Sequence, residues 1–194
     1  DQAYAAPESA GRLLLLVFGG SQGARFFSKM MPQALAKLPS PLRWRLTVVQ
    51  QARPEDVAEV RDALREAEVT AHVAPFFQDL PERIAGSHLV ISRAGASTVA
   101  EVTAIGRPAI LVPLPHAIDN DQLENARRLE DNGGGWCLHQ SGITPESLAA
   151  RLEQLLSNPD VLAKAAHNSK AMGNVSAVNR LADLVADLAG PDQE

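Results

Sequence analysis

The feature that most constrains the fold is the run Leu13–Phe18, LLLLVF, which leads directly into the turn Gly19–Gly23, GGSQG. A continuously apolar strand is typical of the centre of a parallel sheet that is covered on both faces. A glycine-rich turn between a strand and a helix lets the backbone approach a ligand, and the helix start offers unpaired N–H groups. The run and the turn together predict an α/β protein.

Strand and helix signals alternate along the rest of the chain. Further strands are expected at 45–49, 70–74, 89–92, 109–112 and within 133–139. Helices are expected at 23–37, 55–68, 97–105, 120–130, 145–156, 160–172 and 176–189, with a short one ending near 85. The alternation predicts a doubly wound, six-stranded, parallel Rossmann-like sheet that binds ligands at the carboxyl ends of its strands. Residues 1–11 are expected to be a linker, 12–190 one domain and 191–194 a tail.

Composition argues against several classes of protein. A net charge of −5 and an aromatic content of 4% speak against a nucleic-acid partner. No apolar run approaches the roughly 18 residues of a membrane span, so the domain is expected to be soluble. Cys137 is the only cysteine, which excludes an internal disulfide.

The first candidate loop contains Gly20, Ser21 and Gln22. Its backbone and hydroxyl donors suit a phosphate, although a tight turn for close helix–strand packing explains the glycines equally well. The loop lacks the Gly-Lys-Ser/Thr ending of a P-loop and the G-x-G-x-x-G spacing of dinucleotide-binding proteins. Because Gln50 and Gln51 stand where those proteins carry an acidic residue, a dinucleotide-dependent oxidoreductase is the weakest alternative.

The second candidate loop is SRAGASTVAE, Ser92–Glu101. Gly95 and Ala96 keep its turn small, and the helix that follows points its N-terminus at the same crevice as the first loop. Two helix N-termini at one point suit a diphosphate, and the Glu101 carboxylate could accept from two ribose hydroxyls. The alternative is that Glu101 only interacts favourably with the helix dipole.

The third candidate loop is PLPHAIDNDQLENA, 113–126. Asp121, Gln122 and Asn125 offer the mixed donors and acceptors that sugar hydroxyls need, or else a helix cap with solvated residues behind it. His116 is a candidate donor to a phosphate or leaving group, or an ordinary loop histidine. Asp119 and Asp121 form a D-x-D pattern that could bridge Mg²⁺ to a diphosphate, but acidic residues are common at helix starts. No metal site is therefore expected.

In order and spacing, the three loops together resemble the donor-binding half of the bacterial MurG glycosyltransferase family. The resemblance implies one lobe of a two-lobe GT-B enzyme that transfers N-acetylglucosamine (GlcNAc) from UDP-GlcNAc to lipid I, forming the peptidoglycan precursor lipid II, with inversion at the anomeric carbon. It implies no cofactor and no metal. It also implies a full-length protein bound peripherally at the cytoplasmic side of the inner membrane.

The resemblance also assigns roles to residues. Ser21 and Gln22 would face the donor diphosphate and sugar, Phe77 would lie where backbone groups read uracil, and Glu101 would hold the ribose. Arg93 and Gly95–Thr98 would line the diphosphate and sugar side. Asp121 and Gln122 would bind GlcNAc, although the family often has Gln or His at the first of these positions. The expected site is completed by Gly20, Ala96, His116 and Asn125.

The family's amino-terminal lobe carries the catalytic histidine, the lipid I site and the membrane patch, and none of these is found in this sequence. The chain is therefore expected to bind donor without turnover. The alternatives are a UDP-GlcNAc 2-epimerase-like domain and a non-catalytic nucleotide-binding module.

Overall fold

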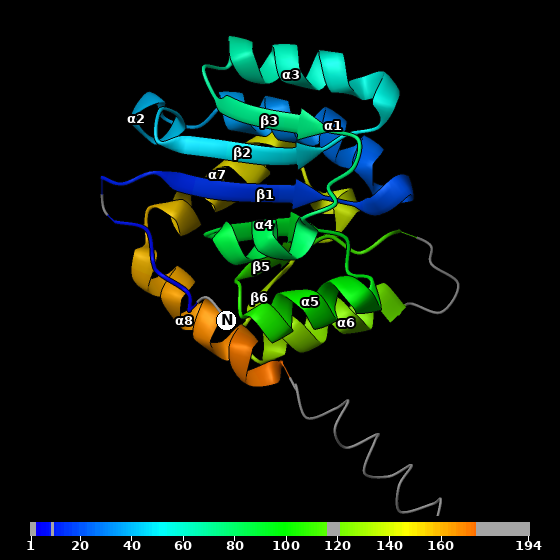
Figure 1. Cartoon of the computed structure of the whole chain (residues 1–194), viewed down its shortest axis with the longest axis vertical. Helices are drawn as coiled ribbons and strands as arrows, with labels where there is room; N and C mark the ends of the chain where they lie inside the picture. Colours follow the sequence, from blue (N-terminus) through cyan, green and yellow to red (C-terminus); the bar gives the residue numbers. More distant parts are fainter. Residues whose placement is uncertain (1–2, 9, 116–120, 174–194) are drawn as a thin grey trace, which may run out of the picture.

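The computed structural model describes residues 3–8, 10–115 and 121–173. Its centre is a six-stranded sheet in the order β3-β2-β1-β4-β5-β6, and every neighbouring pair is parallel. The strands are β1 (Leu13–Phe18), β2 (Leu46–Gln51), β3 (Thr70–Ala74), β4 (Leu89–Ser92), β5 (Ala109–Leu111) and β6 (Gly135–Cys137). The predicted six-stranded parallel sheet is confirmed (Figure 1).

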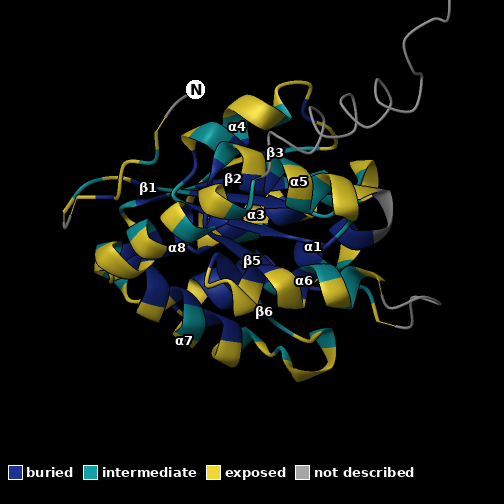
Figure 2. Ribbon diagram, turned by 90° about the horizontal axis from the view of Figure 1, so that it is seen from below, coloured by how far each residue is buried: buried dark blue, intermediate teal, exposed yellow. Residues whose placement is uncertain are grey.

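Helices cover both faces of the sheet. One face packs against α1 (Gly20–Ala36), α3 (Val57–Glu66) and α7 (Pro145–Leu156), and the other against α4 (Leu80–Gly86), α5 (Ala96–Ile105) and α6 (Asp121–Asp131). The last described helix, α8 (Pro159–Met172), contacts α5, α7 and β6. Shorter helical turns are α2 (Ser40–Arg43), η1 (Pro54–Asp56) and η2 (Gln140–Gly142). Figure 2 shows the strands buried between helices whose outward faces are exposed.

The apolar run of β1 is explained by burial on both sides. Leu13, Leu15 and Val17 belong to the core on the α1, α3 and α7 face, while Leu16 and Phe18 belong to the core on the α4, α5 and α6 face. A strand that needs apolar side chains on both faces has no reason to alternate with polar residues. The continuous run therefore predicted a central strand for a physical reason that the structure confirms.

The structure differs from the expected elements at several places. Helix α1 begins at Gly20, not at Gly23, and Gly20 itself has a left-handed φ of +63°, which glycine tolerates. Strand β2 runs from Leu46 to Gln51 instead of over 45–49, and Gln51 pairs with Ala74 of β3. The short helix α2 was not expected. The helix expected at 176–189 lies outside the described residues.

Residues expected to form a linker contact the body of the domain. The Tyr4 hydroxyl donates to the His88 carbonyl oxygen at 3.1 Å, and the Arg107 guanidinium lies 5.4 Å from the centre of the Tyr4 ring. Burial raises the pKa of the Tyr4 hydroxyl. The predicted domain boundary remains a prediction, but this stretch is anchored beside the amino end of β4.

The strand order reverses between β1 and β4. From β1 the chain proceeds outward to β2 and β3 and then returns to β4 on the other side of β1. Helices α1 and α5 follow directly on these two strands, and their starts lie side by side because Phe18 pairs with Ser92. In open α/β sheets, ligands bind in the crevice at such a reversal.

Candidate functional site

A pocket of about 210 Å³ lies at this reversal. It gathers residues from the ends of β1 and β2, the loop after β3, and the starts of α1, α4 and α5. The lining residues are Phe18, Gly20, Gln51, Phe76, Phe77, Leu80, Ser97, Thr98 and Glu101. Glu101 is the only ionisable residue among them. Four predicted site residues, Gly20, Phe77, Thr98 and Glu101, therefore share one pocket although up to 81 positions separate them in the sequence.

Two helices start beside this pocket, and neither is capped by the side chain of the residue that precedes it. The residues before α1 and α5 are Gly19 and Gly95, neither of which has a capping side chain, and neither first turn carries an acidic residue. The first N–H groups of a helix have no partner within the helix, and the helix dipole adds partial positive charge there. Two such ends, starting from adjacent strands, form an environment suited to an anion.

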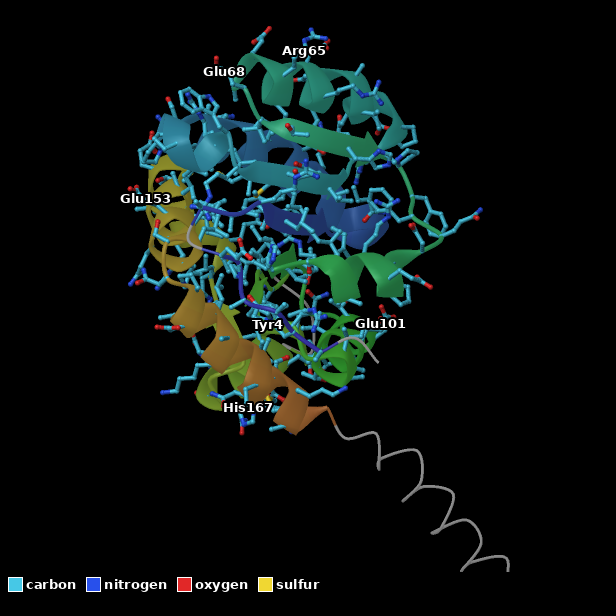
Figure 3. The ribbon with its side chains drawn as sticks, turned by 60° about the vertical axis from the view of Figure 1, so that its left-hand side comes forward. Tyr4, Arg65, Glu68, Glu101, Glu153 and His167 are labelled. Carbon is cyan, nitrogen blue, oxygen red and sulfur yellow. The ribbon has the colours of Figure 1, made fainter. Side chains whose placement is uncertain are left out.

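Glu101 reaches the pocket because of helix periodicity. Ser97 and Thr98 precede it by four and three residues, so the three side chains share one face of α5, and all three line the pocket. In Figure 3 the Glu101 label lies next to α4, whose Leu80 lines the same pocket. Among the described residues, the Glu101 carboxylate has no hydrogen-bond or ion-pair partner. A half-buried carboxylate without a protein partner is available to a ligand.

The loop after β3 forms the opposite wall of the pocket. The Phe77 ring is 8% exposed, with the His72 ring 5.7 Å and the Arg83 guanidinium 4.4 Å from its centre. Arg83 also donates to the Asp79 carboxylate at 2.7 Å, which lowers the pKa of that carboxyl group. Phe76 beside it is 69% exposed. Buried Phe77 anchors the loop, whereas Phe76 presents an aromatic side chain to the pocket and to solvent.

Arg93 is buried and largely committed to contacts within the protein. Its Nη1 atom donates to the carbonyl oxygens of Val112 at 3.1 Å and Pro113 at 3.2 Å, and Nη2 donates to Gln140 at 2.7 Å. Burial lowers the pKa of the guanidinium. Only the Nε atom is buried without a hydrogen-bond partner among the described residues. These contacts secure the chain that leaves β5, and the predicted contact of Arg93 with a diphosphate stays a prediction.

Gln122 and Asn125 on α6 each hold a neighbouring loop with one end of the side-chain amide. The Leu114 N–H donates to Gln122 Oε1 at 3.1 Å, and Asn125 Nδ2 donates to the Ala94 carbonyl oxygen at 3.1 Å. The other polar atom of each amide has no partner among the described residues and is available to sugar hydroxyls. Asp121 begins the helix and is exposed.

Some predicted residues lie outside this description. His116, Asp119 and Asn120 are outside the described residues, as are the side chains of Ser21 and Gln22. Within the part of the chain that is described, no cluster of three His, Cys, Asp or Glu side chains could hold a metal ion. The described helices also include none with the length and apolarity to cross a bilayer.

Gln51, Phe76 and Leu80 line the pocket but were not predicted as site residues. The one signal for Gln51 was its place at the end of an otherwise apolar strand, where a polar side chain falls at the ligand-binding edge of the sheet. That signal was interpreted only as the lack of an acidic residue. Which neighbours Gln51 reaches depends on the strand order, which no local pattern reveals.

Comparison with protein families identifies residues 14–181 as a match to the model described as "Glycosyltransferase family 28 C-terminal domain". Two relatives carry the name UDP-N-acetylglucosamine–N-acetylmuramyl-(pentapeptide) pyrophosphoryl-undecaprenol N-acetylglucosamine transferase. The one from Rhodospirillum rubrum is 51% identical over 97% of this chain and 49% of its own length. The one from Rhodospirillum centenum is 53% identical over 98% of this chain and 50% of its own. The chain thus spans about half the length of these relatives.

Solved structures give a consistent picture. The crystal structure of Acinetobacter baumannii MurG is similar with a TM-score of 0.83 and 32% identity, over 95% of this chain and 55% of that one. WaaG, a glycosyltransferase involved in lipopolysaccharide biosynthesis, is similar with a TM-score of 0.67 and 21% identity, over 89% of this chain and 46% of that one. At 21% identity, the similarity to WaaG shows only that the fold is shared.

Proposed function

The chain belongs to the family of glycosyltransferase family 28 C-terminal domains, and we propose that it is the donor-binding half of an inverting N-acetylglucosaminyltransferase. The proposed donor is UDP-GlcNAc and the proposed acceptor is lipid I, giving lipid II for peptidoglycan synthesis. The names of the relatives support this reaction. Because the chain spans half of those proteins, the activity is proposed for the whole enzyme, and this half alone is proposed to bind donor without turnover.

The observation that carries the proposal is the pocket at the β1/β4 reversal. It combines an unpartnered carboxylate, an aromatic-walled loop and two helix N-termini that each follow a glycine without a capping side chain. A uridine diphosphate needs all three: an acceptor for its ribose hydroxyls, a wall for its base and N–H donors for its phosphates. In this arrangement Glu101 accepts from the ribose, the Phe76–Phe77 loop borders the uracil, and α1 and α5 face the diphosphate.

The chemistry assigned to this half is stabilisation of the leaving group. The acceptor hydroxyl attacks the anomeric carbon of GlcNAc, the bond to the diphosphate oxygen breaks, and UDP leaves with additional negative charge. Fixed N–H dipoles at the starts of α1 and α5 stabilise that charge without reorganisation, which lowers the barrier. The base that takes the acceptor proton, the lipid I site and the peripheral contact with the cytoplasmic side of the inner membrane are assigned to the other half.

A transfer assay tests whether this half alone lacks turnover. With UDP-[¹⁴C]GlcNAc and a soluble lipid I analogue, this chain alone is expected to give no labelled product, and addition of a separately produced amino-terminal half is expected to restore transfer. Turnover by this chain alone would place the catalytic base here and contradict the proposal.

A further inference from the structure

Gln51 connects three neighbouring strand ends with one side-chain amide. Its Oε1 atom accepts from the N–H groups of Gly19 at 3.2 Å and Gly20 at 3.1 Å, at the start of α1. Its Nε2 atom donates to the carbonyl oxygen of Pro75 at 3.1 Å, in the loop after β3. The side chain therefore joins the helix start that faces the proposed diphosphate to the loop that borders the proposed base.

The contacts also determine which N–H groups α1 can offer to an anion. Gly20 has a φ of +63°, a conformation suited to glycine, and its N–H and that of Gly19 are already used by Gln51. The Gly23 N–H donates to the Gly19 carbonyl oxygen at 3.1 Å. The N–H groups of Ser21 and Gln22 thus remain from the first turn, and their direction depends on how Gln51 holds the turn.

We propose that Gln51 is a positioning residue for the donor, which fixes the distance between the diphosphate end and the base end of its site. This inference rests on the proposed function, since only a ligand that spans both ends needs their relative placement. A ligand that contacts both loops gains affinity when the loops are already held at the right distance from each other before it binds. A ligand confined to one loop gains nothing from that link.

The chemistry of the contacts requires an amide. The two glycine N–H groups need an acceptor and the Pro75 carbonyl needs a donor, and glutamine supplies both from one planar group. An ionised glutamate at position 51 would keep the acceptor but lose the donor, and it would add negative charge beside the proposed diphosphate. A methionine of similar length would lose both contacts.

The variants Gln51→Met and Gln51→Glu test the proposal. Each is titrated with UDP and with uridine, and binding is measured by calorimetry or from amide chemical shifts. For Gln51→Met we expect UDP affinity to fall roughly tenfold or more, while uridine affinity changes by less than about threefold. Uridine contacts only the base end of the site and the Glu101 carboxylate, so it does not depend on the link between the two ends. Gln51→Glu is expected to weaken UDP at least as much, again with little effect on uridine.

Gln50→Leu is the matched control. Gln50 is the neighbouring residue of β2, is fully buried, and has no hydrogen-bond partner for either amide atom among the described residues. Its side chain points to the opposite face of the sheet. The control is expected to bind both ligands as the wild type does. Thermal unfolding of each variant confirms that the protein is folded at the titration temperature.

The outcomes separate this inference from the proposed function. If wild type binds UDP and Gln51→Met binds it equally well, or loses UDP and uridine affinity by the same factor, the positioning role is wrong and the donor site stands. If wild type itself fails to bind UDP, the proposed function fails and the positioning role fails with it. A selective loss of UDP affinity supports the inference.

Discussion

Arg93 lies directly against Gly23: a β-carbon built on Gly23 would come within 2.5 Å of the Cγ atom of Arg93. Helix α1 can pass over the end of β4 only because this position has no side chain. The same close approach places the Arg93 guanidinium near Phe26 and Phe27, at 5.1 Å and 5.4 Å from their ring centres. The glycine turn therefore has a packing role as well as the proposed role in anion binding.

Gly23→Ala is predicted to destabilise the fold. The Arg93 side chain is 6% exposed and held by three hydrogen bonds through its Nη atoms, so it cannot move away freely. Overpacking of this kind typically costs about 1–3 kcal/mol, measurable by urea unfolding. Gly86→Ala is the control, since a β-carbon there meets nothing within 4 Å, and its stability is expected to be unchanged or slightly higher. Equal stability of the two variants would contradict the packing role.

Glu101→Ala is predicted to weaken UDP binding at least tenfold. Two hydrogen bonds from ribose hydroxyls to a carboxylate would be lost, each contributing roughly 1.5–3 kcal/mol before water compensates, and about 1.4 kcal/mol corresponds to one decade. Stability should change little, because the carboxylate has no protein partner among the described residues. Calorimetric titration and thermal unfolding measure the two effects.

The ligand 2′,3′-dideoxy-UDP sharpens this test. Wild type should bind it poorly, and Glu101→Ala should no longer distinguish it from UDP. Glu59→Ala removes an exposed glutamate of α3 and serves as the control, with wild-type affinity expected. Full UDP affinity in Glu101→Ala, together with a lower melting temperature, would make Glu101 a structural residue.

The sequence predicted what depends on local pattern and on the alternation of strands with helices. The LLLLVF run indicated a strand buried on both faces, and the rule that ligands bind after parallel strands selected the loops that bring Gly20, Phe77 and Glu101 into one pocket. The burial of Arg93 was not predictable, because arginine is usually exposed and its acceptors, Val112 and Pro113, belong to the neighbouring strand end. The hydrogen bonds of Arg93 form because β4 lies beside β5, and that neighbour relation is known only from the three-dimensional structure of the sheet.

Donor binding is predicted to be independent of divalent metal. The proposed diphosphate contacts are the N–H groups at the starts of α1 and α5, which need no cation. The dissociation constant of UDP-GlcNAc is therefore expected to be the same in EDTA and in Mg²⁺. A large loss of affinity in EDTA that Mg²⁺ restores, and that Asp119→Ala abolishes, would instead support the D-x-D interpretation.

Stability is predicted to fall as the pH is lowered below about 6.5 because of His88. Its Nδ1 atom accepts from the Leu14 N–H at 2.9 Å, and burial together with the Arg107 charge lowers the pKa of the imidazole from its ordinary value of 6.5. The unfolded chain then binds a proton at a higher pH than the folded one, so the stabilisation is complete above pH 6.5 and is lost as pH falls through the folded pKa.

Urea unfolding across pH 5 to 8 checks the prediction for His88. His88→Asn keeps an acceptor but no titrating group, so the fall in stability below about pH 6.5 should become shallower than in wild type. His167→Gln, a change at an exposed histidine of α8, should retain the wild-type profile. If the pH dependence of stability in His88→Asn were the same as in wild type, His88 would be excluded as the cause of the fall in stability.

Titration of the wild-type chain with UDP-GlcNAc, UDP and NAD in parallel tests the central claim most directly. The claim is that the pocket at the carboxyl ends of the strands, where the strand order reverses, holds a uridine diphosphate sugar. Binding of UDP-GlcNAc and UDP with saturable heat, and no measurable heat with NAD, is the predicted result. Binding of NAD without binding of UDP would contradict it.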